Sequence, residues 1–199
     1  MTQGTSTLKK PRRGKSCAAK SSGWLWVGLG MIVLLAWIGW NAWQDSRGTD
    51  VELLNTVGTQ LGEIAPDFTL PTLDGSTFTL SAQQGKPTII FFMAYWCGTC
   101  IPEAQVLVRL NEEYGNAINI IAIDIDTSSS VDSLNQFKRA SGDGAYTWAF
   151  DLDQVVTNSY FVRALDTTLI LDSDGYVVFR DEWPSDYRTL KNVLENMES

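Results

Sequence analysis

The sequence contains no histidine and only three cysteines, Cys17, Cys97 and Cys100. A structural zinc site normally needs four protein ligands, and most of these are cysteine or histidine. With no histidine and no second cysteine pair, we expect no metal site at Cys97 and Cys100. Cys17 precedes a long apolar stretch and is interpreted as a spare thiol.

Acidic residues are absent from the first 44 positions, which carry six of the 15 basic residues. All 23 acidic residues follow Gln44, where only nine basic residues remain. The later part of the chain is therefore strongly negative, which argues against nucleic acid or anionic lipid as its partner.

Charge of either sign is absent between Ser21 and Gln44, and the stretch from Trp24 to Trp43 is mostly apolar. A helix of this length rises about 30 Å, which matches the hydrocarbon core of a bilayer. Because the preceding segment is basic, the positive-inside rule predicts a cytoplasmic N-terminus. A cleaved signal peptide is the alternative, but the apolar run is long for one and no small-x-small site precedes its end.

These observations divide the chain into four parts. We predict a basic cytoplasmic segment over 1–22, a single transmembrane signal-anchor helix over 23–43, a linker over 44–58 and a folded domain over 59–199. The domain is then expected outside the cytoplasm, tethered to the cell membrane. Its roughly 140 residues suffice to bury a full core.

Hydrophobic periodicity in the domain predicts alternating strands and helices. In chain order these are a short strand over 62–70, its hairpin partner over 77–80, a buried strand over 87–93, a helix ending before Gly115, a strand over 118–125, a helix over 131–140, a strand over 148–150, a helix over 154–161, a hairpin of 167–171 and 176–180, and a helix over 186–197. This order predicts an α/β fold with a mixed sheet covered by helices on both faces.

Cys97 and Cys100 are separated by two residues and follow directly on a buried strand. The N-terminus of the next helix carries a partial positive charge and free N–H groups, which lower the pKa of a thiol there. We predict that Cys97 is the nucleophile and that Cys100 resolves the mixed disulfide. A static structural disulfide is the alternative, since an extracytoplasmic compartment is oxidising.

Three segments carry a resemblance to a known family: GEIAPDF at 62–68 with the hairpin that follows, WCGTCIPE at 96–103, and VRALDTTLILDSDG at 162–175. They resemble the thioredoxin superfamily, and more narrowly its membrane-anchored TlpA/ResA branch, which is related to the AhpC/TSA redoxins. The resemblance implies a thioredoxin-like fold with an N-terminal β-hairpin extension. It also implies extracytoplasmic thiol–disulfide exchange with no cofactor beyond the Cys97–Cys100 disulfide.

Two protein partners are implied by the same resemblance. One is a cysteine-containing client outside the cytoplasm, and the other is a membrane electron donor of thiol-transfer type. Clients of such proteins include apocytochrome c, so the resemblance also suggests a role in cytochrome c maturation.

The sequence departs from the family at Asp166, where a cis-proline normally precedes the Thr167–Thr168 pair and faces the dithiol. A non-proline cis bond costs about 2.5–4 kcal/mol, so we expect this loop to be either strained or trans. A carboxylate near Cys97 would oppose ionisation of its thiol and raise the pKa. We therefore place Asp166 and Thr167 in the surroundings of the site. A family proline five residues after the second cysteine is also missing, since Gln105 stands there.

Further candidates flank the cysteines. Glu103 is expected to accept the proton of Cys100, the alternative being an exposed glutamate in the first helical turn. Trp96 is expected to shield the dithiol and contact partners, while Gly98 and Thr99 shape its turn.

Two acids, Asp124 and Asp126, end a predicted strand. We expect both of them to be solvated there, rather than to bind a metal ion.

Two alternative functions use the same cysteines. A thiol peroxidase of peroxiredoxin type would need a threonine three residues before the peroxidatic cysteine, where this chain has Ala94. A copper chaperone would hold a soft ion with both thiolates and Asp166. Copper-binding relatives, however, use a wider cysteine spacing and a histidine.

Overall fold

The computed structural model describes residues 31, 34–37, 40 and 56–197. The chain forms two compact units, Met1–Arg47 and Gly48–Ser199, and the described residues of the first unit are helical. The predicted segment over 1–22, most of the anchor over 23–43 and most of the linker over 44–58 lie outside the described residues. In the described part of the chain, no helix is both long enough and apolar enough to cross a bilayer.

The second unit alternates strands and helices in the predicted order. Its elements are β1 (Thr69–Pro71), β2 (Thr77–Thr79), η2 (Leu80–Gln83), β3 (Thr88–Met93), α2 (Cys100–Tyr114), η3 (Gly115–Ala117), β4 (Asn119–Asp124), α3 (Val131–Ala140), β5 (Thr147–Phe150), α4 (Val155–Ser159), β6 (Thr167–Leu171), β7 (Val177–Asp181) and α5 (Tyr187–Met197).

Five of the strands form one sheet in the order β5-β4-β3-β6-β7. β3, β4 and β5 are parallel, whereas β6 runs antiparallel to β3 and β7 runs antiparallel to β6. β1 and β2 pair as a separate antiparallel hairpin. The predicted mixed sheet and the N-terminal hairpin are both confirmed.

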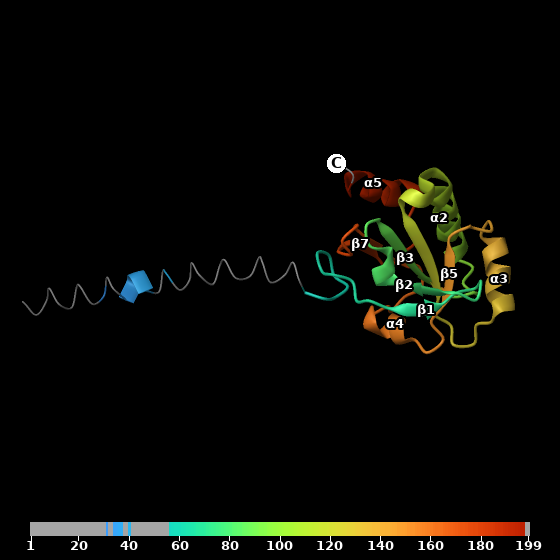
Figure 1. Cartoon of the computed structure of the whole chain (residues 1–199), viewed down its shortest axis with the longest axis horizontal. Coiled ribbons are helices and arrows are strands. Elements are labelled where there is room, and N and C mark those ends of the chain that lie inside the picture. Colours follow the sequence, from blue (N-terminus) through green and yellow to red (C-terminus); the bar gives the residue numbers. More distant parts are fainter. Residues whose placement is uncertain (1–30, 32–33, 38–39, 41–55, 198–199) are drawn as a thin grey trace, which may run out of the picture. The chain divides into compact units, whose positions relative to one another are not determined.

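The sheet separates two hydrophobic clusters. α2, α3 and α5 pack on one face, and α4 with the β1–β2 hairpin packs on the other (Figure 1). β3 lies at the centre of the sheet with all six residues buried. Phe91 and Met93 belong to one cluster and Ile90 and Phe92 to the other, which explains why the sequence of β3 is continuously apolar.

Helix α3 has the predicted bounds, and Ser130 caps it by accepting a hydrogen bond from the Ser133 amide. Two predicted elements are shorter by three or more residues in the structure. The strand predicted over 62–70 is regular only in β1, while Ile64 forms isolated bridges with Val57 and Tyr176. Helix α4 covers less than the predicted 154–161, because residues 154 and 161 both have a positive φ, of 53° and 51°.

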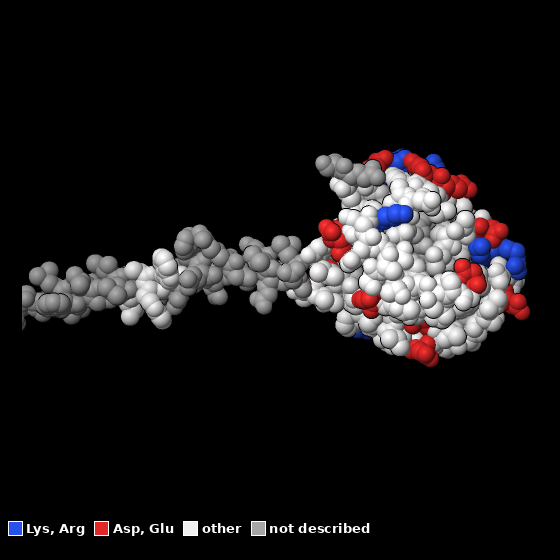
Figure 2. All heavy atoms as spheres, viewed as in Figure 1, with Lys and Arg blue, Asp and Glu red and all other residues white. Residues whose placement is uncertain are grey.

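Acidic side chains are spread over the face of the second unit that Figure 2 shows. The basic side chains on that face stand in separate small groups and form no continuous track. This face therefore offers no basic track of the kind that binds a nucleic-acid backbone.

Candidate active site

The site lies where the ends of two neighbouring strands meet. Because β6 is antiparallel to β3, its first residue, Thr167, pairs with Phe92 near the end of β3. The turn after β3 and the loop before β6 are thereby brought to the same edge of the sheet. Cys97 belongs to the turn and Asp166 to the loop, which explains how residues far apart in the chain share one site.

Cys97 and Cys100 form a disulfide, with an S–S distance of 2.06 Å. Cys97 lies in the turn after β3, and Cys100 is the first residue of α2. The turn is closed by backbone hydrogen bonds, from the Cys97 amide to the Ala94 carbonyl (2.8 Å) and from the Cys100 amide to the Cys97 carbonyl (3.2 Å). Both cysteines are buried, and Cys97, at 4 % exposed, is the more accessible of the two.

The two residues between the cysteines are exposed. The Thr99 hydroxyl oxygen lies 3.3 Å from the Cys97 sulfur, within hydrogen-bond distance. A Cβ atom added at Gly98 would meet no atom within 4 Å, so sterics do not require glycine there. Gly98 instead leaves the surface beside the disulfide open.

Trp96 is an exposed aromatic residue next to the disulfide, with 60 % of its surface accessible. Its indole N–H donates a 2.6 Å hydrogen bond to Asp126 Oδ2. The Ser128 hydroxyl and this indole N–H both lower the pKa of Asp126. The ring is therefore held by its polar edge while its apolar faces remain available to a partner protein.

Glu103 lies in the first turn of α2 and is 1 % exposed, so the alternative of an exposed glutamate does not apply. Its Oε1 accepts a 2.6 Å hydrogen bond from the Thr168 hydroxyl, and its Oε2 accepts one of 3.2 Å from the Ser185 amide. Burial raises the pKa of Glu103 to about 7, although both hydrogen bonds oppose the shift. A carboxyl group with this pKa can gain or lose a proton near neutral pH.

The sequence did not identify Thr168 and Ser185 as partners of Glu103. Thr168 could have been found from strand alternation, because residues 168 and 170 of β6 lie on the same face of the sheet and Ile170 packs in the cluster that includes α2. Ser185 donates through its backbone from the segment before α5, and its sequence carries no signal for this role.

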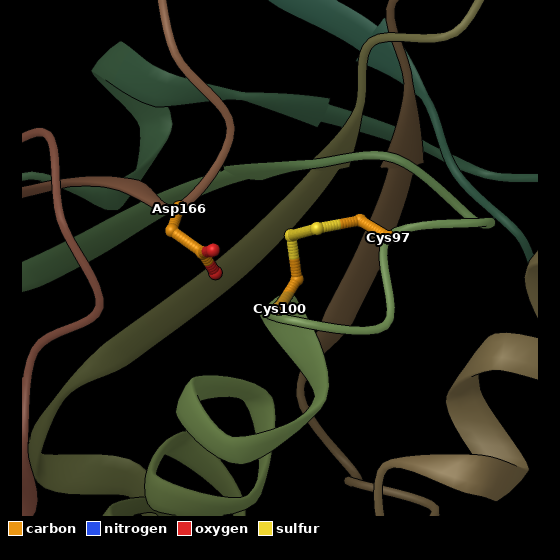
Figure 3. Close-up of side chains that lie close together, drawn as sticks. All are labelled: Cys97, Cys100 and Asp166. Atoms are coloured by element: carbon orange, nitrogen blue, oxygen red, sulfur yellow. A yellow bond between two sulfur atoms is a disulfide. The ribbon is translucent and has the colours of Figure 1, made fainter.

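Asp166 is buried, at 4 % exposed, and its Oδ1 has no hydrogen-bond partner among the described residues. One carboxylate oxygen and the sulfur atoms of Cys97 and Cys100 all lie within 4.8 Å of one another. Figure 3 shows the side chain directed toward the disulfide. Burial raises the pKa of Asp166, and a hydrogen bond with the Thr99 side chain opposes that rise.

The peptide bond before Asp166 is trans, since no cis bond occurs within the described ranges. Asp166 itself has a φ of 61°, in the left-handed region. Of the two geometries expected for this loop, the structure therefore has the trans form. Aspartate tolerates the left-handed region better than most residues.

Thr167, also predicted near the site, is fully buried. Its hydroxyl donates a 2.7 Å hydrogen bond to the Ala164 carbonyl, within the loop before β6. Thr167 therefore holds the loop that carries Asp166, while its neighbour Thr168 contacts Glu103.

Asp124 is fully buried, so the expectation that it would be solvated is wrong. Its carboxylate accepts hydrogen bonds from the Ser129 hydroxyl (2.6 Å) and the Asp126 amide (3.1 Å). Burial nevertheless raises its pKa. These contacts fold the segment after β4 back over the strand end and cover Asp124.

Cys97, Cys100 and Asp166 are the only group of three potential metal-binding side chains that lie this close together in the described part of the chain. Here the two sulfur atoms are bonded to each other. The arrangement in this oxidised form is that of a redox-active disulfide with a carboxylate beside it.

Comparison with known proteins agrees with this chemistry. Residues 61–180 match the AhpC/TSA family. The chain is 31 % identical over 155 residues to the thioredoxin-like protein YneN of Bacillus subtilis, covering 77 % of this chain and 86 % of that protein. It is also 31 % identical over 122 residues to the thiol-disulfide oxidoreductase ResA of Bacillus anthracis, covering 60 % of this chain and 68 % of ResA.

Solved structures show the same fold at lower identity. A secreted disulfide oxidoreductase of Mycobacterium tuberculosis, homologous to DsbE of E. coli, superposes with a TM-score of 0.58 at 23 % identity, covering 65 % of this chain and 95 % of that one. A thioredoxin-like protein of Aeropyrum pernix superposes with a TM-score of 0.57 at 23 % identity, covering 80 % of this chain and 99 % of that one. The chain therefore belongs to the AhpC/TSA family, and it is a thioredoxin-like thiol–disulfide oxidoreductase of the ResA/TlpA type.

Proposed function

We propose that this oxidoreductase reduces or exchanges disulfides of cysteine-containing proteins outside the cytoplasm, while residues 23–43 anchor it in the cell membrane. The observation that carries the proposal is the Cys97–Cys100 disulfide at the start of α2. It lies one helical turn from Glu103, a buried carboxyl group with a pKa of about 7. A permanent structural disulfide would have no use for such a proton acceptor.

The exchange reaction starts from the reduced pair. The Cys97 thiolate attacks one sulfur of the client disulfide, and the other client sulfur leaves as a thiolate that takes up a proton. The Cys100 thiolate then attacks the Cys97 sulfur, and the second client sulfur leaves. The protein ends in the disulfide form that the structure shows, and two electrons have passed to the client.

Cys97 is the better placed of the two sulfurs for the first attack. It is slightly exposed, and it precedes the N-terminus of a 15-residue helix, whose free amides favour a thiolate. Cys100 is fully buried and must lose its proton inside the protein. Glu103 follows it by three residues, on the same side of the helix, and is assigned as the acceptor of that proton.

Electrons for the next cycle are assigned to a membrane protein that transfers them through its own thiols. Anchoring both proteins in one membrane raises their effective concentration. The family resemblance supports this donor, and it makes cytochrome c maturation the first process to test.

The proposal is tested by trapping. In a Cys100→Ser variant the mixed disulfide between Cys97 and a client cannot be resolved, so client proteins should accumulate in a complex that thiol reductants release. The matched control is Cys97→Ser, which removes the attacking sulfur and should trap nothing. Equal capture by both variants, or none by either, would contradict the proposal.

The direction of electron flow needs a separate measurement. A reduction potential of the pair near that of thioredoxin, about −270 mV, indicates a reductant, whereas one near about −120 mV indicates an oxidant. Membrane topology is tested by a reporter enzyme fused after Ser199 that is active only outside the cytoplasm. Reporter activity inside the cytoplasm would overturn the proposed location and leave the exchange chemistry untouched.

A further inference from the structure

Asp166 is a buried acid with an unused hydrogen-bond acceptor. Its side chain is 4 % exposed, and Oδ1 has no partner among the residues that the structure describes. The carboxylate is directed at the disulfide, with an oxygen within 4.8 Å of both sulfur atoms (Figure 3). A buried acceptor without a donor is costly, so this position suits a donor that is absent from the oxidised form.

Asp166 is paired with no basic side chain of the described residues. Glu103 of α2 and Asp181 of β7 add negative charge to the same region, and β3 contributes no titratable side chain. The Thr99 side chain is its one polar partner on the cysteine side. Neither a cation nor a second strong donor therefore neutralises this carboxylate.

Reduction of the disulfide supplies the missing donor, because each sulfur atom then carries a proton. We propose that Asp166 is a hydrogen-bond acceptor of the site, which takes a hydrogen bond from a thiol of the reduced pair and so keeps that pair protonated. The inference rests on the proposed exchange reaction and adds a group that controls when the reaction starts.

Two physical effects act in the same direction. The hydrogen bond to Oδ1 stabilises the neutral thiol, and the negative charge of Asp166 disfavours a thiolate beside it. Both effects raise the pKa of the attacking thiol, against the effect of the α2 N-terminus. Once the proton has left to solvent, the sulfur bonds to a client sulfur, and the other client sulfur departs and takes up a proton. The second cysteine then loses its proton to Glu103 and attacks the first sulfur, which closes the disulfide and releases the remaining client sulfur as a thiol.

Asp166→Asn is the sharpest test of this role. Asparagine has nearly the same shape and also tolerates the left-handed backbone at φ 61°, but it carries no charge. Asp181→Asn is the matched control, because it removes one charge near Glu103 from a residue outside the group that includes both sulfur atoms.

The experiment uses the full-length chain in detergent, reduced and kept with a metal chelator. Its oxidation by hydroxyethyl disulfide, an uncharged reagent, is followed from about pH 5 to about pH 10, on both sides of the usual cysteine pKa. Samples are quenched in acid, and free thiols are counted by mass spectrometry.

We expect Asp166→Asn to lower the inflection of the rate profile by at least about one pH unit. One unit gives about ten times more thiolate at neutral pH, but each thiolate is about threefold less nucleophilic, so the net rate rises about three- to fourfold. On the alkaline plateau the same variant should be about threefold slower. The two profiles therefore cross, which loss of structure alone would not produce, and Asp181→Asn should follow the unmodified protein.

An unchanged inflection in Asp166→Asn, or an equal shift in Asp181→Asn, would overturn the inference. If the unmodified protein fails to react with the disulfide at every pH, the proposed exchange function fails instead. Circular dichroism of each oxidised variant checks the fold. Should Asp166→Asn not fold, Asp166→Gly, which accepts a positive φ without strain, must show the same downward shift.

Discussion

The Thr168 hydroxyl donates a 2.6 Å hydrogen bond to Glu103 Oε1, joining β6 to the first turn of α2. Both residues are buried, and the Ser185 amide binds the other carboxylate oxygen. Glu103 thus has a donor on each oxygen, in contrast to Asp166, whose Oδ1 has none in the described part of the chain. The two carboxylates differ in their surroundings, and so they should respond differently to substitution.

Thr168→Val should destabilise the domain more at pH 8 than at pH 5. Valine has the shape of threonine without the donor, and leaving a buried charged acceptor unpaired costs about 1–3 kcal/mol. At pH 5 Glu103 is protonated and uncharged, so loss of the Thr168 hydrogen bond should cost less free energy of unfolding than at pH 8. Urea unfolding at both pH values measures the difference. The control, Thr167→Val, removes a hydrogen bond to the Ala164 carbonyl and should lower the free energy of unfolding by about the same amount at both pH values.

Glu103→Gln should remove a pH dependence of stability. Burial raises the pKa of Glu103 from 4.5 to about 7 in the folded protein. The folded state therefore binds more protons between these values, and this contribution to stability is complete below pH 4.5 and lost as pH rises through 7. It amounts to about 3 kcal/mol. Between pH 4.5 and 7 the unfolding free energies of the unmodified protein and Glu103→Gln should therefore diverge by about this amount. Parallel curves would contradict the raised pKa of Glu103.

The same variant should slow the second step of exchange. Without the carboxylate, the buried Cys100 thiol has no acceptor for its proton, and loss of a general base typically costs 10²–10⁴-fold. The mixed disulfide of Cys97 with a small disulfide should then accumulate and be visible by mass spectrometry. Resolution as fast as in the unmodified protein would assign the proton to another group.

Asp126→Ala should weaken client capture in a domain that still folds. The substitution removes the acceptor of the Trp96 indole and leaves the exposed ring free to move. Hydrogen bonds from the Ser128 amide and hydroxyl to Asp126 are also lost, and each of these exposed bonds contributes about 0.5–1.5 kcal/mol, so the unfolding free energy should fall while the domain still folds. The yield of trapped client in a Cys100→Ser background measures the effect. Asp132→Ala, an acid at the start of α3, is the control and should leave the yield unchanged.

Ser130→Ala should affect stability alone. Ser130 caps α3 and forms a reciprocal pair of hydrogen bonds with Ser133. Loss of such a cap costs about 0.5–2 kcal/mol. Thermal unfolding should register this loss, while the rate of thiol oxidation stays the same. A changed rate of thiol oxidation would mean that the stability of α3 affects the reactivity of the cysteines.

Much of the fold follows from local sequence patterns. The apolar run of β3 predicts a central strand because both of its faces are covered, and the hydrophobic periodicity over 131–140 predicts the bounds of α3. The strand expected over 62–70 is shorter, because Ile64 pairs through single bridges with Val57 and Tyr176. Those pairings depend on the tertiary fold, which periodicity does not contain.

For the site, the sequence predicts the cysteines, Glu103 and the departure at Asp166. It does not predict the hydrogen bonds to Glu103, because Thr168 and Ser185 reach it from distant segments. The buried state of Asp124 was missed for a similar reason, since a polar residue at a strand end gives no sign that Ser129 will cover it. Such contacts depend on strand register and on the path of the loops, which the local sequence pattern does not determine.

The φ of 61° at Asp166 restricts which residues evolution can place beside the disulfide. Proline is confined to a φ near −65°, so a proline at position 166 would conflict with the present backbone. Replacement of Asp166 by proline would require the loop between α4 and β6 to be rebuilt along with it. Among the replacements of Asp166 that need one nucleotide change, those to asparagine and glycine fit the present loop backbone, and both would remove the negative charge from the site.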